Sequence, residues 1–262
     1  MEALRTRGVD ARLEAWDDPR VAWDWAPLTI IRSTWNYTEH LDAFLAWLRA
    51  VGVVTTLCNP ADVVLWNHHK QYLVELADAG LAVVPTTLVR PGEEVPALGG
   101  DVVIKPAVSV GAIGTQRIKE DRNAAVAHLS TLLERGAALV QPYCADIEHG
   151  GERSLVYLDG TLSHTIRKRP AAGDFRVHEH FGGTNDAVDV TSTDRALAEG
   201  ALAHIADRFG AEPLLYGRVD IVDGPGGPAL SELELIEPYL YLRDAPDPAA
   251  AEARVVDAIE RR

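Results

Sequence analysis

Two segments near the C-terminus constrain the fold most, because each alternates charged and apolar residues with the period of a β-strand. Tyr216–Val222 and Ala229–Ile236 flank a turn rich in glycine and proline, which predicts a hairpin. Residues two apart in a strand share a face. Pairing Asp220 opposite Glu232 therefore keeps the charged side chains of both strands on one face.

The charged face of this hairpin gathers three carboxylates, Asp220, Glu232 and Glu234, and the same register places Arg218 beside Glu234. Two carboxylates about 5 Å apart repel by roughly 3 kcal/mol at an effective dielectric of about 20. The face therefore needs a bound cation or open water, and the apolar neighbours along both strands argue against open water. Carboxylate oxygens are the hard ligands that Mg²⁺ prefers, so we predict a magnesium site. A ladder of Arg–Glu pairs on a solvated sheet is the alternative.

Residues 1–64 are predicted to form a parallel α/β domain. Leu28–Arg32 is a continuous apolar run of the kind found in buried parallel strands, and Val53–Leu57 is predicted to be the next strand. Thr38–Val51 lies between them and carries apolar residues at helical spacing. A short strand is expected at Ala11–Ala15. The domain is expected to lack its first strand. A truncated sequence or a misassigned initiator methionine would explain the missing strand.

The rest of the chain shows no repeats or flexible linkers, and we divide it into two α+β lobes, residues 65–143 and 144–262. The first lobe is expected to contain helices at Asn67–Ala79 and Asn123–Glu134 and strands at Leu81–Val84, Asp101–Lys105, Thr115–Lys119 and Ala138–Gln141. The second is expected to contain a hairpin of Ser154–Leu158 and Thr161–Arg167, a strand at Phe175–Phe181, helices at Ser192–Phe209 and Pro248–Arg262, and the charged hairpin. The fold class is therefore α/β.

Lysine is rare in this chain. The 25 basic residues include only four lysines, at Lys70, Lys105, Lys119 and Lys168. A chain that uses arginine almost everywhere favours lysine where a compact ammonium is needed. Chance retention on an exposed face is the alternative.

Lys105 ends a β-branched run that begins at Val102, so we expect it to be partly buried and to need an anionic partner. Residues 107–114, here called the lid loop, are small and can bring backbone N–H groups close to phosphates. The segment is not a Walker loop, because the lysine precedes it and no Gly-Lys-Ser/Thr follows. A hairpin loop with a surface lysine is the alternative.

The net charge of −14 argues against nucleic acid as a partner, because phosphate backbones require a basic surface. A small anion such as ATP needs only a local cationic cluster. No apolar run is long enough to span a membrane, and the N-terminus lacks a signal-peptide stretch. Cys58 and Cys144 are far apart and are expected to be ordinary thiols. These features predict a cytoplasmic protein.

From about Asn59 to Tyr241 the ordered motifs resemble the ATP-grasp ligases, in the glutathione-synthetase-like carboxylate–amine branch. The motifs are Asn67-His-His-Lys70, Val102 to Thr115, Leu139-Val-Gln-Pro-Tyr143, and the charged hairpin. The resemblance implies an N-terminal α/β domain and two lobes that sandwich ATP. It departs from the family at Glu234, where the common pattern has asparagine, and Glu237 is a further metal candidate.

The resemblance also implies roles for individual residues. The residues expected to contact ATP are Lys70, Lys105, Gly111, Ala112, Gly114, Gln141, Pro142, Tyr143 and Glu148. The residues expected to bind the metal are Asp220, Glu232 and Glu234. Arg176 and Lys105 are expected to be catalytic, with Arg176 stabilising the acyl phosphate and the incoming nucleophile.

A narrower resemblance links the chain to the ATP-grasp group that includes D-cycloserine synthetase, the O-ureido-D-serine cyclo-ligase. It rests on Trp16-Asp-Asp-Pro19, Arg32-Ser-Thr-Trp-Asn-Tyr37, Gly173-Asp-Phe-Arg176 and Glu232-Leu-Glu-Leu-Ile-Glu-Pro238. Arg32 to Trp35 follows a predicted parallel strand, where ligands collect, although Trp35 could equally be a core residue. Expected substrate contacts are Arg32, Arg153, Arg167, Lys168 and Arg176, with at least one of them an ordinary surface charge. His178 and His180 are spaced as a pair but lack a third metal ligand.

The implied reaction has two steps. The carboxylate of a small amino-acid-like substrate attacks the γ-phosphate of ATP to give an acyl phosphate, with Mg²⁺ as cofactor. An amine, or another nitrogen of the same molecule, then displaces phosphate. A regulatory ATP-binding module without turnover and a phosphotransferase are the alternatives. The sequence leaves the oligomeric state open, including a homo-oligomer.

Overall fold

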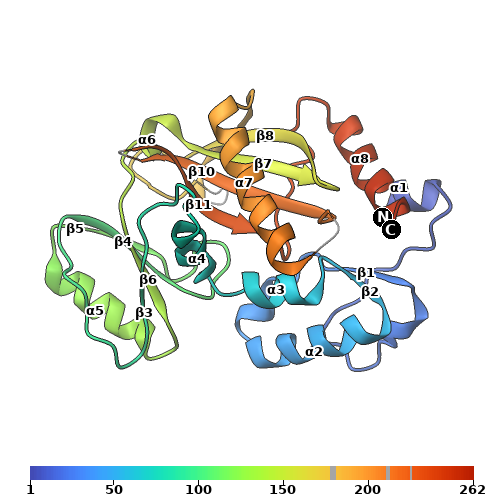
Figure 1. Cartoon of the computed structure of the whole chain (residues 1–262), viewed down its shortest axis with the longest axis horizontal. Coiled ribbons are helices and arrows are strands. Elements are labelled where there is room, and N and C mark those ends of the chain that lie inside the picture. The colour runs from blue at the N-terminus through green and yellow to red at the C-terminus, as the bar shows by residue number, and fades with distance from the viewer. Residues whose placement is uncertain (178–180, 211–212, 225) are drawn as a thin grey trace.

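A computed structural model describes residues 1–177, 181–210, 213–224 and 226–262, and the strands among these residues form three sheets. The sheets have two, four and five strands, and they follow one another along the chain (Figure 1). No described helix is long and apolar enough to cross a membrane.

The N-terminal unit is built on a parallel pair of strands, β1 (Leu28–Ile30) and β2 (Thr56–Cys58). Helix α2 (Leu41–Val54) packs its buried face on this pair, with short 3-10 helices at Trp23–Trp25 and Trp35–Thr38. The predicted strand at Ala11–Ala15 is wrong. Those residues are mostly exposed and have no neighbouring strand to complete backbone hydrogen bonds.

The central unit is a four-stranded antiparallel sheet in the order β3-β6-β4-β5. Its strands are β3 (Thr87–Val89), β4 (Asp101–Pro106), β5 (Gln116–Lys119) and β6 (Ala138–Pro142). Helix α5 (Arg122–Leu133) covers one face and begins where the Asp121 side chain accepts a hydrogen bond from the Ala124 amide. The lid loop connects β4 to β5.

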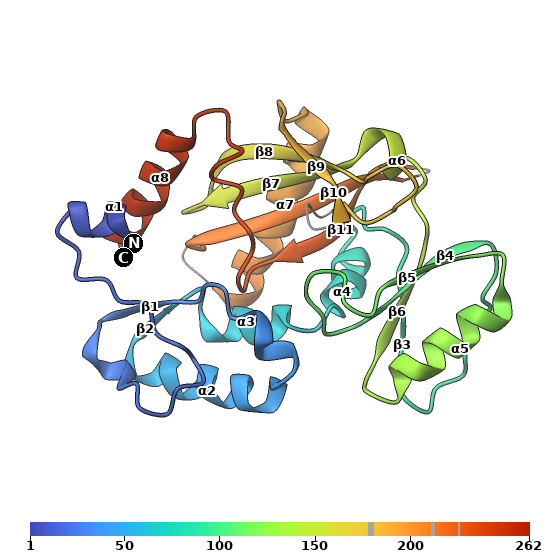
Figure 2. The same cartoon turned by 180° about the vertical axis from the view of Figure 1, so that it is seen from behind.

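The C-terminal unit is a five-stranded antiparallel sheet in the order β11-β10-β7-β8-β9. Its strands are β7 (Glu152–Leu158), β8 (Thr161–Arg169), β9 (Thr184–Ala187), β10 (Tyr216–Gly224) and β11 (Gly227–Glu234). Helix α7 (Ser192–Phe209) packs across one face (Figure 1). The remaining helices are α1 (Glu2–Thr6), α6 (Ile147–Gly150) and α8 (Pro248–Glu260). Figure 2 shows both termini beside each other, where α1 meets α8.

The expected helix at Asn67–Ala79 is instead two helices, α3 (Ala61–Asn67) and α4 (Tyr72–Asp78). The chain breaks between them because the Lys70 amide donates to the Ala107 carbonyl at 2.7 Å, a tertiary bond in place of a helical one. The buried residues of α4 pack against the five-stranded sheet.

Two other expected strands also differ from the structure. Leu81–Val84 makes only one isolated bridge, between Val83 and Leu230, so it is not a full strand. Phe175–Val177 is not a strand either, and His178 and His180 lie outside the described residues.

Two buried asparagines hold the N-terminal unit against the edge of the C-terminal sheet. The Asn59 side chain donates to the carbonyls of Tyr216 and Leu235, both at 2.8 Å. The Asn67 side chain donates to the Leu233 carbonyl and accepts from the Leu235 amide. Asn67 therefore satisfies backbone groups at the open edge of β11, and Asn59 does so where the chain enters β10 and leaves β11.

Candidate active site

A cavity of about 670 Å³ lies where the three units meet, within the size range of small-molecule sites. The N-terminal unit contributes Trp35 and Tyr37, the central unit contributes Lys105 and part of the lid loop, and the C-terminal unit contributes the charged face of the β10–β11 hairpin. Side chains distant in sequence therefore share one space.

Lys70 stands in the break between α3 and α4 and points into this cavity. Its ammonium donates to the Ser109 carbonyl of the lid loop at 2.8 Å and pairs with Glu232 at 3.0 Å. The side chain is buried. Lys70 therefore connects the lid loop to the charged hairpin.

Lys105 leaves β4 toward the same space. No carboxylate among the described residues lies within ion-pair distance of its ammonium. Burial and the neighbouring Lys70 lower the pKa of Lys105, while Glu232 acts in the opposite direction. A partly buried ammonium without an anionic partner is unfavourable, so this position is suited to bind an anion.

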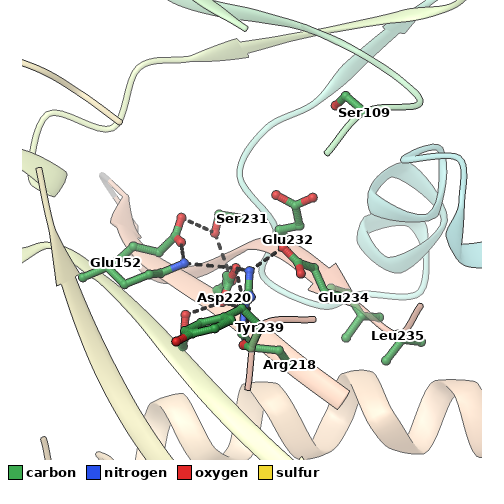
Figure 3. Close-up of polar contacts among 12 residues, drawn as sticks. Ser109, Glu152, Arg218, Asp220, Ser231, Glu232, Glu234, Leu235 and Tyr239 are labelled. Atoms are coloured by element: carbon green, nitrogen blue, oxygen red, sulfur yellow. Dashed lines mark hydrogen bonds and ion pairs between the residues drawn. The ribbon is translucent and has the colours of Figure 1, made fainter. Parts of the chain in front are cut away.

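The predicted register of the charged hairpin is confirmed: Asp220 lies opposite Glu232, and Arg218 lies opposite Glu234. Arg218 contacts the carboxylates of both Asp220, at 2.8 Å, and Glu234 (Figure 3). The prediction followed from strand parity, because a slip by one residue would have placed every charge on the other face.

Asp220 is the most heavily bonded carboxylate of the site. It accepts a hydrogen bond from Ser154 at 2.6 Å, two from the Arg218 guanidinium, and one from Lys168 at 3.3 Å. Lys168 also pairs with Glu152 on the neighbouring strand. Burial opposes the ionisation of Asp220, but Arg218 and Lys168 outweigh it and lower the pKa of this carboxyl.

The other carboxyls of the cavity differ in charge balance. Burial raises the pKa of Glu232, but Lys70 and Lys105 outweigh it and bring the pKa to about 2. Burial and repulsion from Glu232 raise the pKa of Glu234 to about 7, against the influence of Arg218. Burial and repulsion from Glu234 raise the pKa of Glu237 to about 8. Burial, more than any single neighbouring charge, therefore disfavours the ionised carboxylates at the Glu234–Glu237 end.

The carboxylates of this cavity are the candidate ligands for the predicted Mg²⁺. In the part of the chain that the structure describes, no three His, Cys, Asp or Glu side chains are grouped as a metal site. The donor type nevertheless fits, because Glu232 and Glu234 offer hard oxygen ligands, each now paired with one cation, Lys70 or Arg218. Both oxygens of Asp220 are already engaged by Ser154, Lys168 and Arg218, so Asp220 fits a metal only after one of these contacts is released.

The expected ATP contacts Gln141 and Pro142 end β6, and Tyr143 follows them. The Gln141 side chain donates to the Thr86 hydroxyl at 2.8 Å, and the Tyr143 hydroxyl donates to Glu148 at 2.9 Å. Arg117 stacks over the Tyr143 ring at 3.4 Å. Gln141, Pro142, Tyr143 and Glu148 are not among the residues that line the cavity.

The lid loop lies across the cavity. Gly111 and Ala112 line it, and both have positive φ, of 59° and 62°. Gly114 turns the chain back with φ of 74°, and a Cβ there would meet Pro106 at 2.9 Å. The lid residues Val108 and Val110 pack against the apolar core of the N-terminal unit.

The expected substrate contacts Arg153 and Arg167 lie on the opposite face of the five-stranded sheet from Lys168. Arg153 is buried but points away from the cavity, where it pairs with Asp194 and Asp223, both at 2.8 Å. Arg167 lies opposite Arg153 in the sheet, and its Nε is buried without a partner. Adjacent strand residues face opposite sides, so Arg153 and Arg167 cannot share the face of Ser154 and Lys168. Among these predicted contacts, Lys168 alone joins the Asp220 network.

Arg176 and Arg32 are not among the residues that line the cavity. Arg176 pairs with Asp174 at 2.8 Å and stacks over the Phe181 ring at 3.6 Å. The Arg32 guanidinium lies 5.2 Å from the Tyr216 ring centroid, and its Nη1 is buried without a partner.

Several residues of the Asp220 network were not assigned a role from the sequence, above all Arg218, Glu152 and Ser154. Arg218 lines the cavity directly. Glu152 and Ser154 face the same side of β7, where Ser154 donates to Asp220 and Glu152 pairs with Lys168. Their period-two spacing beside a predicted strand was the available signal, but only the pairing of β7 with β10 reveals what they contact.

Comparisons with known proteins agree with this geometry. The family described as prokaryotic glutathione synthetase, ATP-grasp domain, matches residues 81–239, and the one described as D-cycloserine synthetase DcsG, N-terminal domain, matches residues 1–59. The cycloserine biosynthesis protein DcsG of Streptomyces lavendulae is 35% identical over 264 residues, covering 95% of this chain and 88% of that protein. A glutathione synthetase of Vibrio parahaemolyticus is 29% identical, covering 69% of this chain but 57% of that enzyme.

Solved structures give the same result. The crystal structure of D-cycloserine synthetase DcsG superposes with a TM-score of 0.88 at 33% identity, covering 99% of this chain and 92% of that one. A D-alanine–D-alanine ligase of Bacillus anthracis complexed with ATP reaches a TM-score of 0.60 at 15% identity, covering 90% and 78%, which shows a shared fold. The chain therefore belongs to the glutathione-synthetase-type ATP-grasp ligases, enzymes that use ATP to form carbon–nitrogen bonds.

Proposed function

We propose that this enzyme activates the carboxylate of a small amino-acid-like substrate as an acyl phosphate and closes a carbon–nitrogen bond within the same molecule. The observation that carries the proposal is the unpaired Lys105 ammonium in a cavity shared with Lys70 and the Glu232 carboxylate. Similarity to DcsG extends through the N-terminal unit, which lines the substrate side of the cavity. That similarity favours ring closure, with O-ureido-D-serine as the first candidate substrate.

In this proposal Lys70 and Lys105 bind the phosphates of ATP, and the lid loop closes over them through Gly111 and Ala112. Adenine lies toward the end of β6, at Gln141 to Tyr143. Glu232 and Glu234 would hold Mg²⁺, with Asp220 joining them if Lys168 releases it. The ion would neutralise phosphate charge as a Lewis acid.

Arg218 is placed to stabilise charge as the substrate reacts. It lines the cavity, and Asp220 and Glu234 fix its guanidinium from two sides. The substrate carboxylate attacks the γ-phosphorus, ADP leaves, and the nitrogen then attacks the acyl carbon and expels phosphate. A preoriented guanidinium beside the carbonyl oxygen would lower the barrier of the second step.

Arg218→Lys is expected to lower kcat by about 100-fold or more, because lysine keeps the charge but loses the planar two-sided geometry. Arg176→Ala is expected to change kcat by less than about 10-fold, because Arg176 pairs with Asp174 outside the cavity lining. Phosphate release at saturating substrate measures both. The reverse order of effects would return the catalytic role to Arg176.

A mass-resolved screen of amino-acid derivatives with MgATP tests the reaction class. Ring closure predicts ADP, phosphate and a product lighter than the substrate. A product heavier than either of two substrates would instead mean intermolecular ligation, and a stable phosphorylated product would mean a phosphotransferase. Binding of MgATP without phosphate release across the panel would mean a regulatory module. The panel should include O-ureido-D-serine, other amino acids with a second nitrogen, and simple amino acids.

We also propose a cytoplasmic location, where ATP is supplied and thiols stay reduced. Cys58 and Cys144 are both free in the structure, which suits that compartment. The net charge of −14 and the Lys70, Lys105 and Arg218 side chains that line the cavity favour a small anionic substrate over nucleic acid.

A further inference from the structure

Glu237 is a cavity carboxylate that the reaction described above does not use. It follows the end of β11 by three residues and lines the cavity. Within the described part of the chain, no hydrogen bond or ion pair to its carboxylate is formed, and its oxygens are not among the buried unpartnered atoms. They are therefore open to a molecule bound in the cavity.

The charges around Glu237 come from several elements. Glu234 on β11 repels it, while Lys70 before α4, Arg32 after β1 and Arg218 on β10 attract it from a distance. Lys70 is held by Glu232 and Ser109, and Arg218 by Asp220 and Glu234, so neither is available as its partner. Burial without a close cation raises the pKa of Glu237 to about 8.

The cavity that Glu237 lines also has aromatic walls. Trp35, Tyr37 and Tyr239 all line the cavity, and the Trp35 and Tyr239 side chains remain 60% and 50% exposed. Large apolar side chains left exposed inside a cavity are suited to cover a ligand. Aromatic faces also attract cations. A carboxylate with open oxygens in a cavity that also has aromatic walls is suited to pair with a primary ammonium group.

We propose that Glu237 binds the ammonium group of the amino-acid-like substrate and so makes the enzyme select amino acids over the corresponding hydroxy acids. The inference rests on the proposed function, because it places the substrate in the same cavity. Burial of the ammonium against Glu237 leaves the substrate carboxylate to face Arg218 and the ATP phosphates.

Glu237→Gln is expected to raise the melting temperature by at least about 2 °C at pH 9. The folded-state pKa of this carboxyl lies above its unfolded value, so the charge disfavours folding once the pH exceeds about 4.5, and the penalty is complete above about 8. The difference between variant and wild type should therefore vanish near pH 4.5. Glu199→Gln, on the exposed face of α7, is the matched control and should shift little. A lower melting temperature at pH 9 would mean that Glu237 supports the fold rather than a ligand.

The selectivity test compares two probes, O-ureido-D-serine and the same molecule with a hydroxyl in place of the α-ammonium. The wild type is expected to prefer the ammonium probe by roughly 100-fold in kcat/KM, as for a charged hydrogen bond. Glu237→Gln should lose most of that preference by weakening only the ammonium probe, with unchanged affinity for MgADP. An equal loss for both probes, or a changed magnesium requirement, would overturn the proposal.

Calorimetric binding of the two probes with MgADP present separates this inference from the proposed reaction. If neither probe is turned over but the wild type binds the ammonium probe more tightly, and Glu237→Gln removes the difference, Glu237 keeps its role while the reaction proposal fails. If the wild type shows no preference in binding, the role of Glu237 is overturned whether or not turnover occurs.

Discussion

We expect Lys105→Ala to lower kcat/KM by at least about 1,000-fold, while the free energy of unfolding stays the same or rises. Lys105 has no carboxylate partner in the described structure, so its charge contributes to ligand binding rather than to folding. A cation placed on the transferred phosphate acts mainly in the transition state, where charge develops. Steady-state phosphate release and urea unfolding give the two quantities.

Lys119→Ala is the matched control, because Lys119 is an exposed lysine on the adjacent strand β5. It should leave both turnover and stability nearly unchanged. Normal turnover by Lys105→Ala would remove Lys105 from the site. Loss of stability alongside activity would mean that Lys105 has a structural partner in solution.

Asp220→Asn is expected to lower both activity and stability, in contrast to Lys105→Ala. The carboxylate neutralises Arg218 and Lys168 inside the sheet, and removal of one partner of a buried ion pair costs about 3–5 kcal/mol. Arg218 would also lose the contact that fixes its guanidinium, so kcat should fall by more than about 100-fold. Urea unfolding monitors the first effect and phosphate release the second.

Asp223→Asn provides a control from the same strand. Asp223 pairs with Arg153 away from the cavity, its side chain is 39% exposed, and Arg153 keeps Asp194 as a partner. Its loss should cost less than about 1 kcal/mol and leave turnover intact. Equal effects of the two substitutions would mean that the Asp220 network has no special role.

The charged hairpin could be predicted from the sequence because strand periodicity fixes which residues share a face. Once Asp220 is placed opposite Glu232, Arg218 must lie beside Glu234, and the structure has this register. Helix α7 was predicted at its observed limits, because Thr191 caps its first turn and Gly210 ends it.

Other features depend on contacts between distant segments. The break at Lys70 comes from a bond to Ala107, which no local pattern around residue 70 signals. Arg153 and Lys168 are both basic residues of paired strands, yet Arg153 pairs with Asp194 on α7 and Lys168 pairs with Asp220 on the other face of the sheet. Alternation could have separated Arg167 from Lys168, but only the sheet order shows which face holds the site.

An oxygen-transfer measurement tests the central claim most directly. The substrate that supports turnover is labelled with ¹⁸O in its carboxylate, and the phosphate released with ADP is analysed by mass spectrometry. Attack of the carboxylate on the γ-phosphorus, followed by cleavage of the acyl carbon–oxygen bond, predicts one ¹⁸O atom in each phosphate. Unlabelled phosphate accompanied by product formation would contradict an acyl phosphate and the ligase mechanism built on it.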